Sequence, residues 1–124
     1  MKISNTFNDD WFSGSNEGQL SVDVFKQNNE LVIRSLAAGV NPDDLDISVH
    51  GDLLTIRGTR KNDKTISEDD WYYRECYWGG FSRSIVLPYD VSADSAKAAI
   101  KNGVLEIRIP IREKGKSVKI KWEE

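Results

Sequence analysis

The stretch LDISVHGDLLTIRG, residues 45–58, decides the fold class of this chain of 124 residues. Leu45, Ile47 and Val49 alternate with polar residues, which is typical of a strand that has one buried face. Gly51 and Asp52 then supply a two-residue turn, and the apolar run LLTIRGTR follows as a return strand. The stretch therefore predicts a β-hairpin.

Similar segments continue on both sides of this hairpin. Upstream, LSVDVFK and LVIRSLAA flank the turn residues QNNE; downstream come FSRSIVLP, VLEIRIP after an Asn-Gly turn, and a last strand-like segment, VKIKW. Short strands that are separated by Gly, Pro and Asn predict an all-β sandwich. Between Gly58 and Phe81 the sandwich pattern stops, and a connection of that length usually has a function or is disordered.

One segment points to a different structure. SADSAKAAIKNG, residues 92–103, has a Ser cap, an Ala-rich body and a closing Gly, which together are typical of a short helix. Propensity is a weak guide that tertiary packing can override, so periodicity alone leaves helix and strand open here.

Charge and composition exclude several classes of function. The chain has 17 basic and 20 acidic residues, so its net charge of -3 argues against binding to nucleic acid or to anionic membranes. Its first residues, MKISNTFNDDWF, contain no apolar run that could serve as a signal peptide. A single cysteine favours a reducing compartment. We therefore expect a cytoplasmic protein with no membrane partner.

Residues for catalysis or metal binding are sparse. His50 is the sole histidine and closes a strand beside a Gly turn, and Cys76 is the sole cysteine, next to Glu75. No phosphate-binding Gly motif occurs. Neighbouring carboxylate pairs such as Asp43-Asp44 are expected in turns. No apolar pocket there could push the pKa values of the two carboxyl groups apart, as general acid-base catalysis requires. We expect no enzyme activity, no metal and no cofactor.

The stretch WYYRECYWGGF, residues 71–81, holds six of the twelve aromatic residues. These rings could form a stacking platform for nucleic acid, a part of the core, or a surface for another protein chain. A stacking platform needs interleaved Lys and Arg, but here Arg74 and Arg83 stand beside Glu68, Asp69, Asp70 and Glu75. We expect Phe81 to lie in the core, leave Trp78 open between core and surface, and favour a protein surface for the others.

Three motifs resemble the α-crystallin domain of the small heat-shock proteins over about residues 20–122. YRECYWGGFSRSIVLP is similar to a family segment through Tyr73, Arg74, Glu75, Gly79, Phe81, Arg83, Leu87 and Pro88. AAIKNGVLEIRIP resembles the family's Ala-x-x-x-Asn-Gly-Val-Leu signature, and LAAGVNPDDLDISVHGDLLTIRG resembles its turn and hairpin. The resemblance implies an immunoglobulin-like β-sandwich with a strand at 97–101 and a turn at 92–95.

The resemblance also implies function: an ATP-independent holdase chaperone that binds partly unfolded proteins. The alternative is a non-assembling β-sandwich module of the co-chaperone kind, and a third is a binder of single-stranded nucleic acid. The domain boundaries that follow are a flexible N-terminal arm at 1–19, the α-crystallin domain at 20–111 and a C-terminal extension at 112–124.

In this family the long loop carries a strand that pairs with the neighbouring subunit. The resemblance places that strand near 71–73, on the neighbour's strand near 21–26, in a homodimer. On a strand, Trp71 and Tyr73 would share one side and Tyr72 and Arg74 the other. Arg83 points inward by period two and must find carboxylates or carbonyls, either within its own subunit or at the dimer interface. The interface residues so implied are Trp71, Tyr72, Tyr73, Arg74, Arg83, Val22 and Val24.

Two further sites complete the expectations. Val118 and Ile120 match the family's apolar-x-apolar tail, which would enter a groove formed by Leu45, Ile47, Val49, Ala98 and Ile100 of a neighbouring subunit. The rival interpretation is that the tail pairs with its own domain as an edge strand. Trp11 and Phe12 are large rings in a polar arm, and we expect them to bind clients.

Overall fold

The computed structural model describes residues 2–4, 18–112 and 118–123. In these residues the chain forms nine strands and three short 3-10 turns, and no α-helix. The strands are β1 (Lys2–Ser4), β2 (Gly18–Gln19), β3 (Val22–Gln27), β4 (Glu30–Leu36), β5 (Leu45–His50), β6 (Leu53–Arg60), β7 (Gly79–Val86), β8 (Lys97–Lys101) and β9 (Val104–Pro110). The 3-10 turns are η2 (Pro42–Asp44), η3 (Glu68–Asp70) and η4 (Ala93–Ser95).

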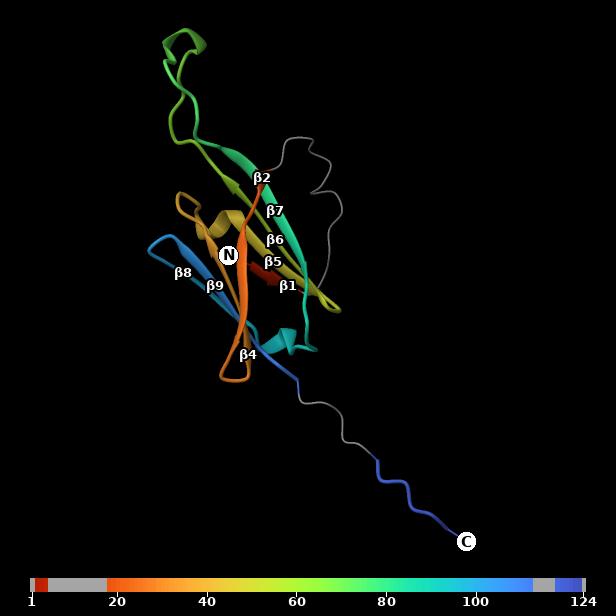
Figure 1. Ribbon diagram of the computed structural model, residues 1–124. Coiled ribbons are helices and arrows are strands. Elements are labelled where there is room, and N and C mark those ends of the chain that lie inside the picture. The colour runs from red at the N-terminus through yellow and green to blue at the C-terminus, as the bar shows by residue number, and fades with distance from the viewer. Residues whose placement is uncertain (1, 5–17, 113–117, 124) are drawn as a thin grey trace.

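The strands form two sheets that pack face to face (Figure 1). One sheet has the order β1-β5-β6-β7-β2 and the other the order β3-β4-β9-β8. Leu31 and Ile33 from the second sheet meet Ile47 and Ile56 from the first in one buried cluster. The predicted all-β sandwich is therefore confirmed.

The turns predicted from Asn and Gly close the hairpins of both sheets. Asn28 and Asn29 have φ of 51° and 62°, and Asn102 and Gly103 have φ of 53° and 76°. Positive φ at both central residues matches the right-handed twist of the strands that such turns join. Gly51 adopts a φ of 62° in the β5–β6 turn.

The segment with helical propensity is a strand, as the family resemblance implied. Residues 97–101 form β8, which pairs antiparallel with β9, and η4 occupies Ala93–Ser95. Ala98 and Ile100 are half-buried and pack against the core, while their neighbours in sequence are exposed. Packing of this alternating face on the core outweighs the helical preference of the Ala-rich sequence.

Two very short strands were not predicted. β1 pairs in parallel with β5, and β2 pairs in parallel with β7, so each lies at an edge of the larger sheet. Both fall in the stretch 1–19 that was expected to be a flexible arm. Strands of two or three residues are too short to produce a detectable alternation in sequence.

Candidate functional site

The β6–β7 loop, residues 61–78, projects beyond both sheets at the top of the view (Figure 1). Its only regular element is η3, so a single chain forms no strand at 71–73. A strand needs a partner for its backbone groups. The predicted exchanged strand at 71–73 therefore stays a prediction.

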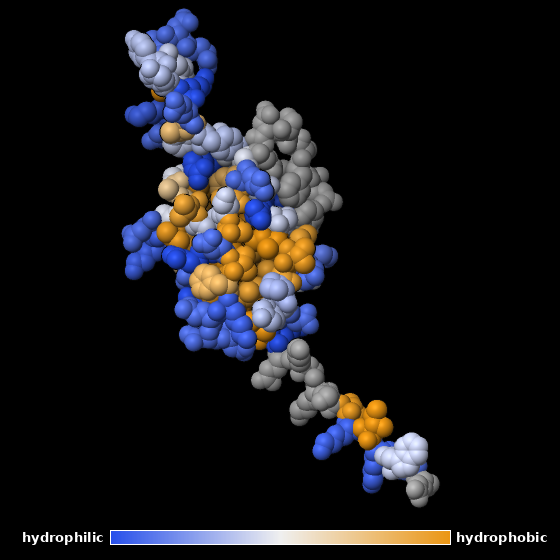
Figure 2. Space-filling model, in the orientation of Figure 1, coloured by the Kyte–Doolittle hydropathy of each residue, from blue (hydrophilic) through white to orange (hydrophobic). Residues whose placement is uncertain are grey.

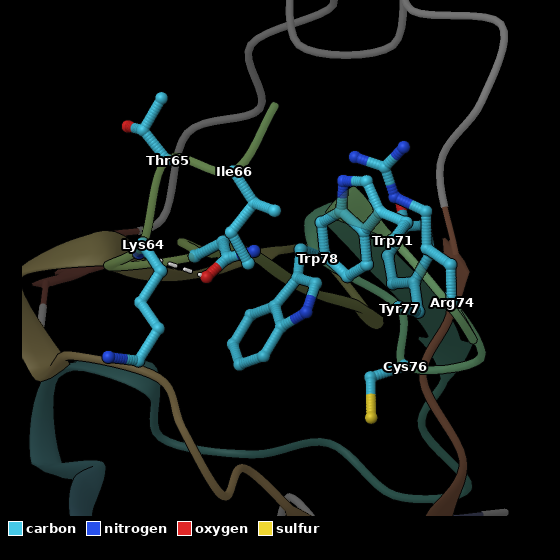
Figure 3. Close-up of a pocket in the computed structure, with 9 residues that line it drawn as sticks. Lys64, Thr65, Ile66, Trp71, Arg74, Cys76, Tyr77 and Trp78 are labelled. Atoms are coloured by element: carbon cyan, nitrogen blue, oxygen red, sulfur yellow. Dashed lines mark hydrogen bonds between the residues drawn. The ribbon is translucent and has the colours of Figure 1, made fainter. Parts of the chain in front are cut away.

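Three side chains organise the tip of this loop. The guanidinium of Arg74 lies 4.1 Å from the ring centre of Trp71 (Figure 3). It also lies 3.3 Å from a carboxylate oxygen of Glu68. The ion pair of Arg74 with Glu68 is exposed, so it contributes little to stability, whereas the ring of Trp71 is half-buried. Trp71 and Arg74, expected on opposite sides of a strand, are thus in contact within one chain.

Tyr72 and Tyr73 point into solvent, with 95% and 84% of their surface exposed. Adjacent exposed rings of this size are unusual in a monomeric surface and are enriched where proteins bind one another. The two limbs of the loop form the walls of an open hollow of about 460 Å³ (Figure 3). Its walls are formed by Asn62, Lys64, Thr65, Ile66, Trp71, Arg74, Cys76, Tyr77 and Trp78.

Tyr77 anchors the base of the loop, a role that sequence analysis missed. Its hydroxyl accepts a hydrogen bond from the amide of Gly18 at 3.1 Å and donates to the carbonyl of Gly80. A Cβ on Gly18 would lie only 2.9 Å from the Tyr77 ring. The contact joins β2 to the entry of β7, across more than fifty residues of sequence.

β3 is the outermost strand of its sheet and pairs only with β4 among the described strands. Its other edge therefore presents unpaired backbone groups, as the exchange prediction requires. The side chains of Val22 and Val24 share a side with buried Ser35 and Ile33, and Val22 packs on the core. Val22 would thus serve an interface mainly through its backbone, whereas Val24 leaves 38% of its surface exposed.

Arg83 is half-buried in β7, and its guanidinium donates a long hydrogen bond of 3.5 Å to the carbonyl of Leu20. Among the residues the structure describes, no carboxylate forms an ion pair with it. The carbonyl contact is one of the two kinds of partner that were expected. A role for Arg83 at the dimer interface stays a prediction.

The groove residues predicted for the tail come from both sheets. Leu45, Ile47 and Val49 are buried in the core, while Ala98 and Ile100 remain half-buried at the opposite strand β8. The backbone of β1 already occupies the outer edge of β5, with Ile3 in register with Ile47. The strand that would form one wall of the groove is therefore paired within the same chain.

The tail residues 118–123 form no strand and are exposed (Figure 1). Val118 and Ile120 expose 86% and 96% of their surface, and Figure 2 shows apolar side chains beside the tail lysines. Burying both apolar side chains against protein would therefore be favourable. The rival edge-strand pairing is absent from these described tail residues. Trp11 and Phe12, the predicted client-binding rings, lie outside the described residues.

The described part of the chain offers no metal site, because no three His, Cys, Asp or Glu side chains cluster there. None of its helical segments is long or apolar enough to cross a membrane.

Comparison with known proteins identifies the family to which this fold belongs. The model of the Hsp20/alpha crystallin family matches residues 23–121. The chain belongs to this family of small heat shock proteins. Members of the family are non-enzymatic chaperones that form oligomers and bind clients.

Curated relatives agree. Small heat shock protein C2 of Rickettsia felis is 33% identical over 111 residues, which cover 88% of this chain and 72% of the relative. Small heat shock protein C4 of the same organism is also 33% identical, over 80% of this chain and 61% of its own length.

Solved small heat shock protein structures share the fold. Heat shock protein 16.0 of Schizosaccharomyces pombe superposes with a TM-score of 0.74 at 28% identity, over 88% of this chain and 80% of its own. The hspA structure of Xanthomonas axonopodis has a TM-score of 0.69 at 33% identity, over 78% of this chain and 97% of its own.

Proposed function

We propose that this small heat shock protein is an ATP-independent holdase, which binds partly unfolded proteins and keeps them from aggregating. The observation that carries the proposal is that one chain leaves its association surfaces unpaired. The edge of β3, the rings of Tyr72 and Tyr73 and the apolar tail are all exposed in the described chain. Exposed apolar surface of this kind marks sites for protein partners.

The proposed building block is a homodimer in which each β6–β7 loop reaches the β3 edge of its partner. The loop already projects beyond the sandwich, so reaching a neighbour needs no unfolding of either sheet. Backbone hydrogen bonds would give the pairing affinity, and the aromatic side chains would give it specificity. Deleting residues 62–76 should therefore produce monomers, and a retained dimer mass would disprove the exchange.

In a larger assembly, the tail would bind reversibly to a neighbouring subunit. Val118 and Ile120 would enter the groove of Leu45, Ile47, Val49, Ala98 and Ile100 on a neighbouring subunit. A structure of the Xylella fastidiosa small heat-shock protein, 28% identical, is described as having a distinct high-order structure.

Clients would bind to apolar surface in the arm, at Trp11 and Phe12, and along the edges of the domain. The decisive assay is light scattering of a heat-labile client protein, with and without this chain and without ATP, alongside its mass in solution. Suppression at near-stoichiometric amounts supports a holdase. An assembled protein that leaves aggregation unchanged overturns the proposal and favours a non-chaperone interaction module.

In that assay, replacing Trp11 and Phe12 with Ser should weaken suppression without lowering the melting temperature. Full suppression by this variant would place the client site elsewhere. We propose the cytoplasm as the compartment, because a single exposed Cys76 suits a reducing environment.

A further inference from the structure

A small hollow of about 240 Å³ lies at a corner of the four-stranded sheet, beside the free edge of β3. We call it the Leu36 hollow, and it is lined by Ser21, Val22, Asp23, Arg34, Ser35, Leu36 and Val104. Sites for drug-sized ligands have volumes of about 300–1,000 Å³. The Leu36 hollow therefore suits one protein side chain better than a free metabolite.

The floor of the Leu36 hollow is apolar. Leu36 and Val104 stand opposite each other in the pairing of β4 with β9, and Leu36 leaves 73% of its surface exposed. Ser21 precedes β3 at the open edge, and its small side chain leaves access to Leu36 from that edge. The Ser35 hydroxyl donates a hydrogen bond of 2.7 Å to the Ser21 carbonyl, which fixes the backbone at this entrance.

The rim of the Leu36 hollow carries one carboxylate, Asp23, and one guanidinium, Arg34. The strand register places Asp23 opposite Arg34, and Arg34 opposite Glu106. Arg34 pairs with Glu106 at 3.6 Å, and Glu106 also binds Arg108 at 3.1 Å, whereas Asp23 forms no ion pair with any residue described. The carboxylate of Asp23 at the free edge is therefore left without a cationic partner, and it suits a cation on an incoming strand.

The proposed exchanged strand carries an aromatic ring and a cation two residues apart. Paired in parallel with β3, it would bring Tyr72 beside Ser21, at the entrance of the Leu36 hollow, when Arg74 lies beside Asp23. Residues two apart on a strand share a face, so Tyr72 and Arg74 would lie together. Tyr72 has no buried contact in a single chain, and the partner of Arg74, Glu68, is itself exposed. Exposed ion pairs are weak, so Arg74 can exchange its carboxylate partner at little cost.

We propose that the Leu36 hollow receives Tyr72 of the partner subunit, while Asp23 pairs with the partner's Arg74. This inference rests on the proposed exchange dimer and adds which side chains give it specificity. Tyrosine suits the site because its ring can cover Leu36 and Val104 while its hydroxyl stays at the polar rim. Two-fold symmetry would form the contact twice in each dimer.

Charge-reversal variants of the full-length protein test the proposed ion pair between Asp23 and the partner's Arg74. Asp23→Arg places arginines opposite each other in its homodimer, and Arg74→Asp places carboxylates opposite each other. Each variant should dimerise at least tenfold more weakly than the wild type in sedimentation equilibrium. A mixture of the two should form heterodimers of near wild-type affinity, because both contacts are then matched. If the mixture remains as weak as its components, the pairing of Asp23 with Arg74 is wrong.

Substitutions of Tyr72 and Tyr73 test which face of the exchanged strand contacts the Leu36 hollow. Tyr72→Ser should weaken the dimer at least tenfold, as should Leu36→Ser, whereas Tyr73→Ser on the opposite face should weaken it less. Glu68→Gln controls for loss of the internal Arg74 contact and should leave the dimer unchanged. All substituted side chains are exposed, and an unchanged melting temperature checks that each variant folds. Equal or reversed effects at Tyr72 and Tyr73 would overturn the proposal.

The loop deletion separates this inference from the dimer model itself. Monomers after deletion of 62–76, together with wild-type dimerisation of the Tyr72 and Asp23 variants, would retain the exchange and reject the Leu36 hollow. A dimer that survives the deletion would reject both.

Discussion

The hydroxyl of Tyr77 and the amide of Gly18 are hydrogen-bonded at 3.1 Å, which ties the first residues of β2 to the base of the β6–β7 loop. The same hydroxyl donates to the carbonyl of Gly80, so one side chain bridges two backbone segments. The absence of a Cβ at Gly18 permits this approach. The loop is therefore attached to the sandwich at a defined point while its tip remains exposed.

Tyr77→Phe should loosen this attachment and leave the core intact. The ring remains, but the Gly18 amide and the Gly80 carbonyl lose their partner, at a cost of about 1 kcal/mol in the free energy of unfolding. Hydrogen exchange should become faster at the amide of Gly18. Tyr89→Phe is the matched control, because it removes an exposed hydroxyl at a distant site. Equal exchange in both variants would show that the bridge has no effect.

Gly58→Ala should destabilise the sandwich itself. A Cβ there would lie 2.6 Å from the Phe81 ring, 2.9 Å from a methyl carbon of Leu45 and 3.0 Å from the Asp44 carbonyl. Overpacking of this kind costs about 1–3 kcal/mol, which thermal unfolding would measure as a lower melting temperature. Gly51→Asn is the control: that turn has open space around it, and Asn tolerates its positive φ. An unchanged melting temperature for Gly58→Ala would mean that the Phe81 ring, the Leu45 side chain and the Asp44 carbonyl can shift without cost.

The sequence was sufficient to predict the hairpins and the sandwich because their signals are local. Gly51-Asp52 and Asn102-Gly103 mark turns, and Ile47 and Ile107 belong to strands whose alternation shows directly which face is buried. The 92–103 segment needed the family resemblance, because its local preference is helical. β1 and β2 could not be predicted, since their parallel pairing depends on distant strands.

The arrangement of the candidate site was harder to predict from the sequence. Alternation along 71–74 assumes an extended strand, but within one chain that segment has no partner, and Arg74 turns toward Trp71 instead. The Tyr77 bridge depends on Gly18, which is adjacent only after folding. The burial of Val22 against the core likewise follows from the register of β3, which sequence alone does not supply.

Arg83→Ala distinguishes two roles for a half-buried guanidinium. If the carbonyl of Leu20 is its only partner, the domain should lose about 1 kcal/mol of stability and the dimer should persist. If a carboxylate of the neighbouring subunit also contacts it, the dimer should weaken by several kcal/mol, because that carboxylate would be left buried. Thermal unfolding and solution mass, measured together, separate the two. No change in either quantity would show that water already solvates Arg83.

The tail makes the most direct prediction about assembly. Val118 and Ile120 lie two residues apart, so on an extended strand they would point the same way, with Lys119 and Lys121 opposite. Burying both apolar side chains contributes about 3–5 kcal/mol before ordering costs, and such a contact alone binds at millimolar concentration or more weakly. Two tails per dimer raise the effective affinity by avidity while each contact can still release.

Replacing Val118 and Ile120 with Gly should therefore shift the solution mass to that of a dimer, without lowering the melting temperature of the domain. Lys119 and Lys121 replaced by Ser provide the matched control, because this variant keeps both apolar side chains. Since β1 occupies the outer edge of β5, Ile3→Pro should free that edge and strengthen assembly through the tail. An unchanged mass with a lower melting temperature in the Gly variant would instead place the tail on its own domain.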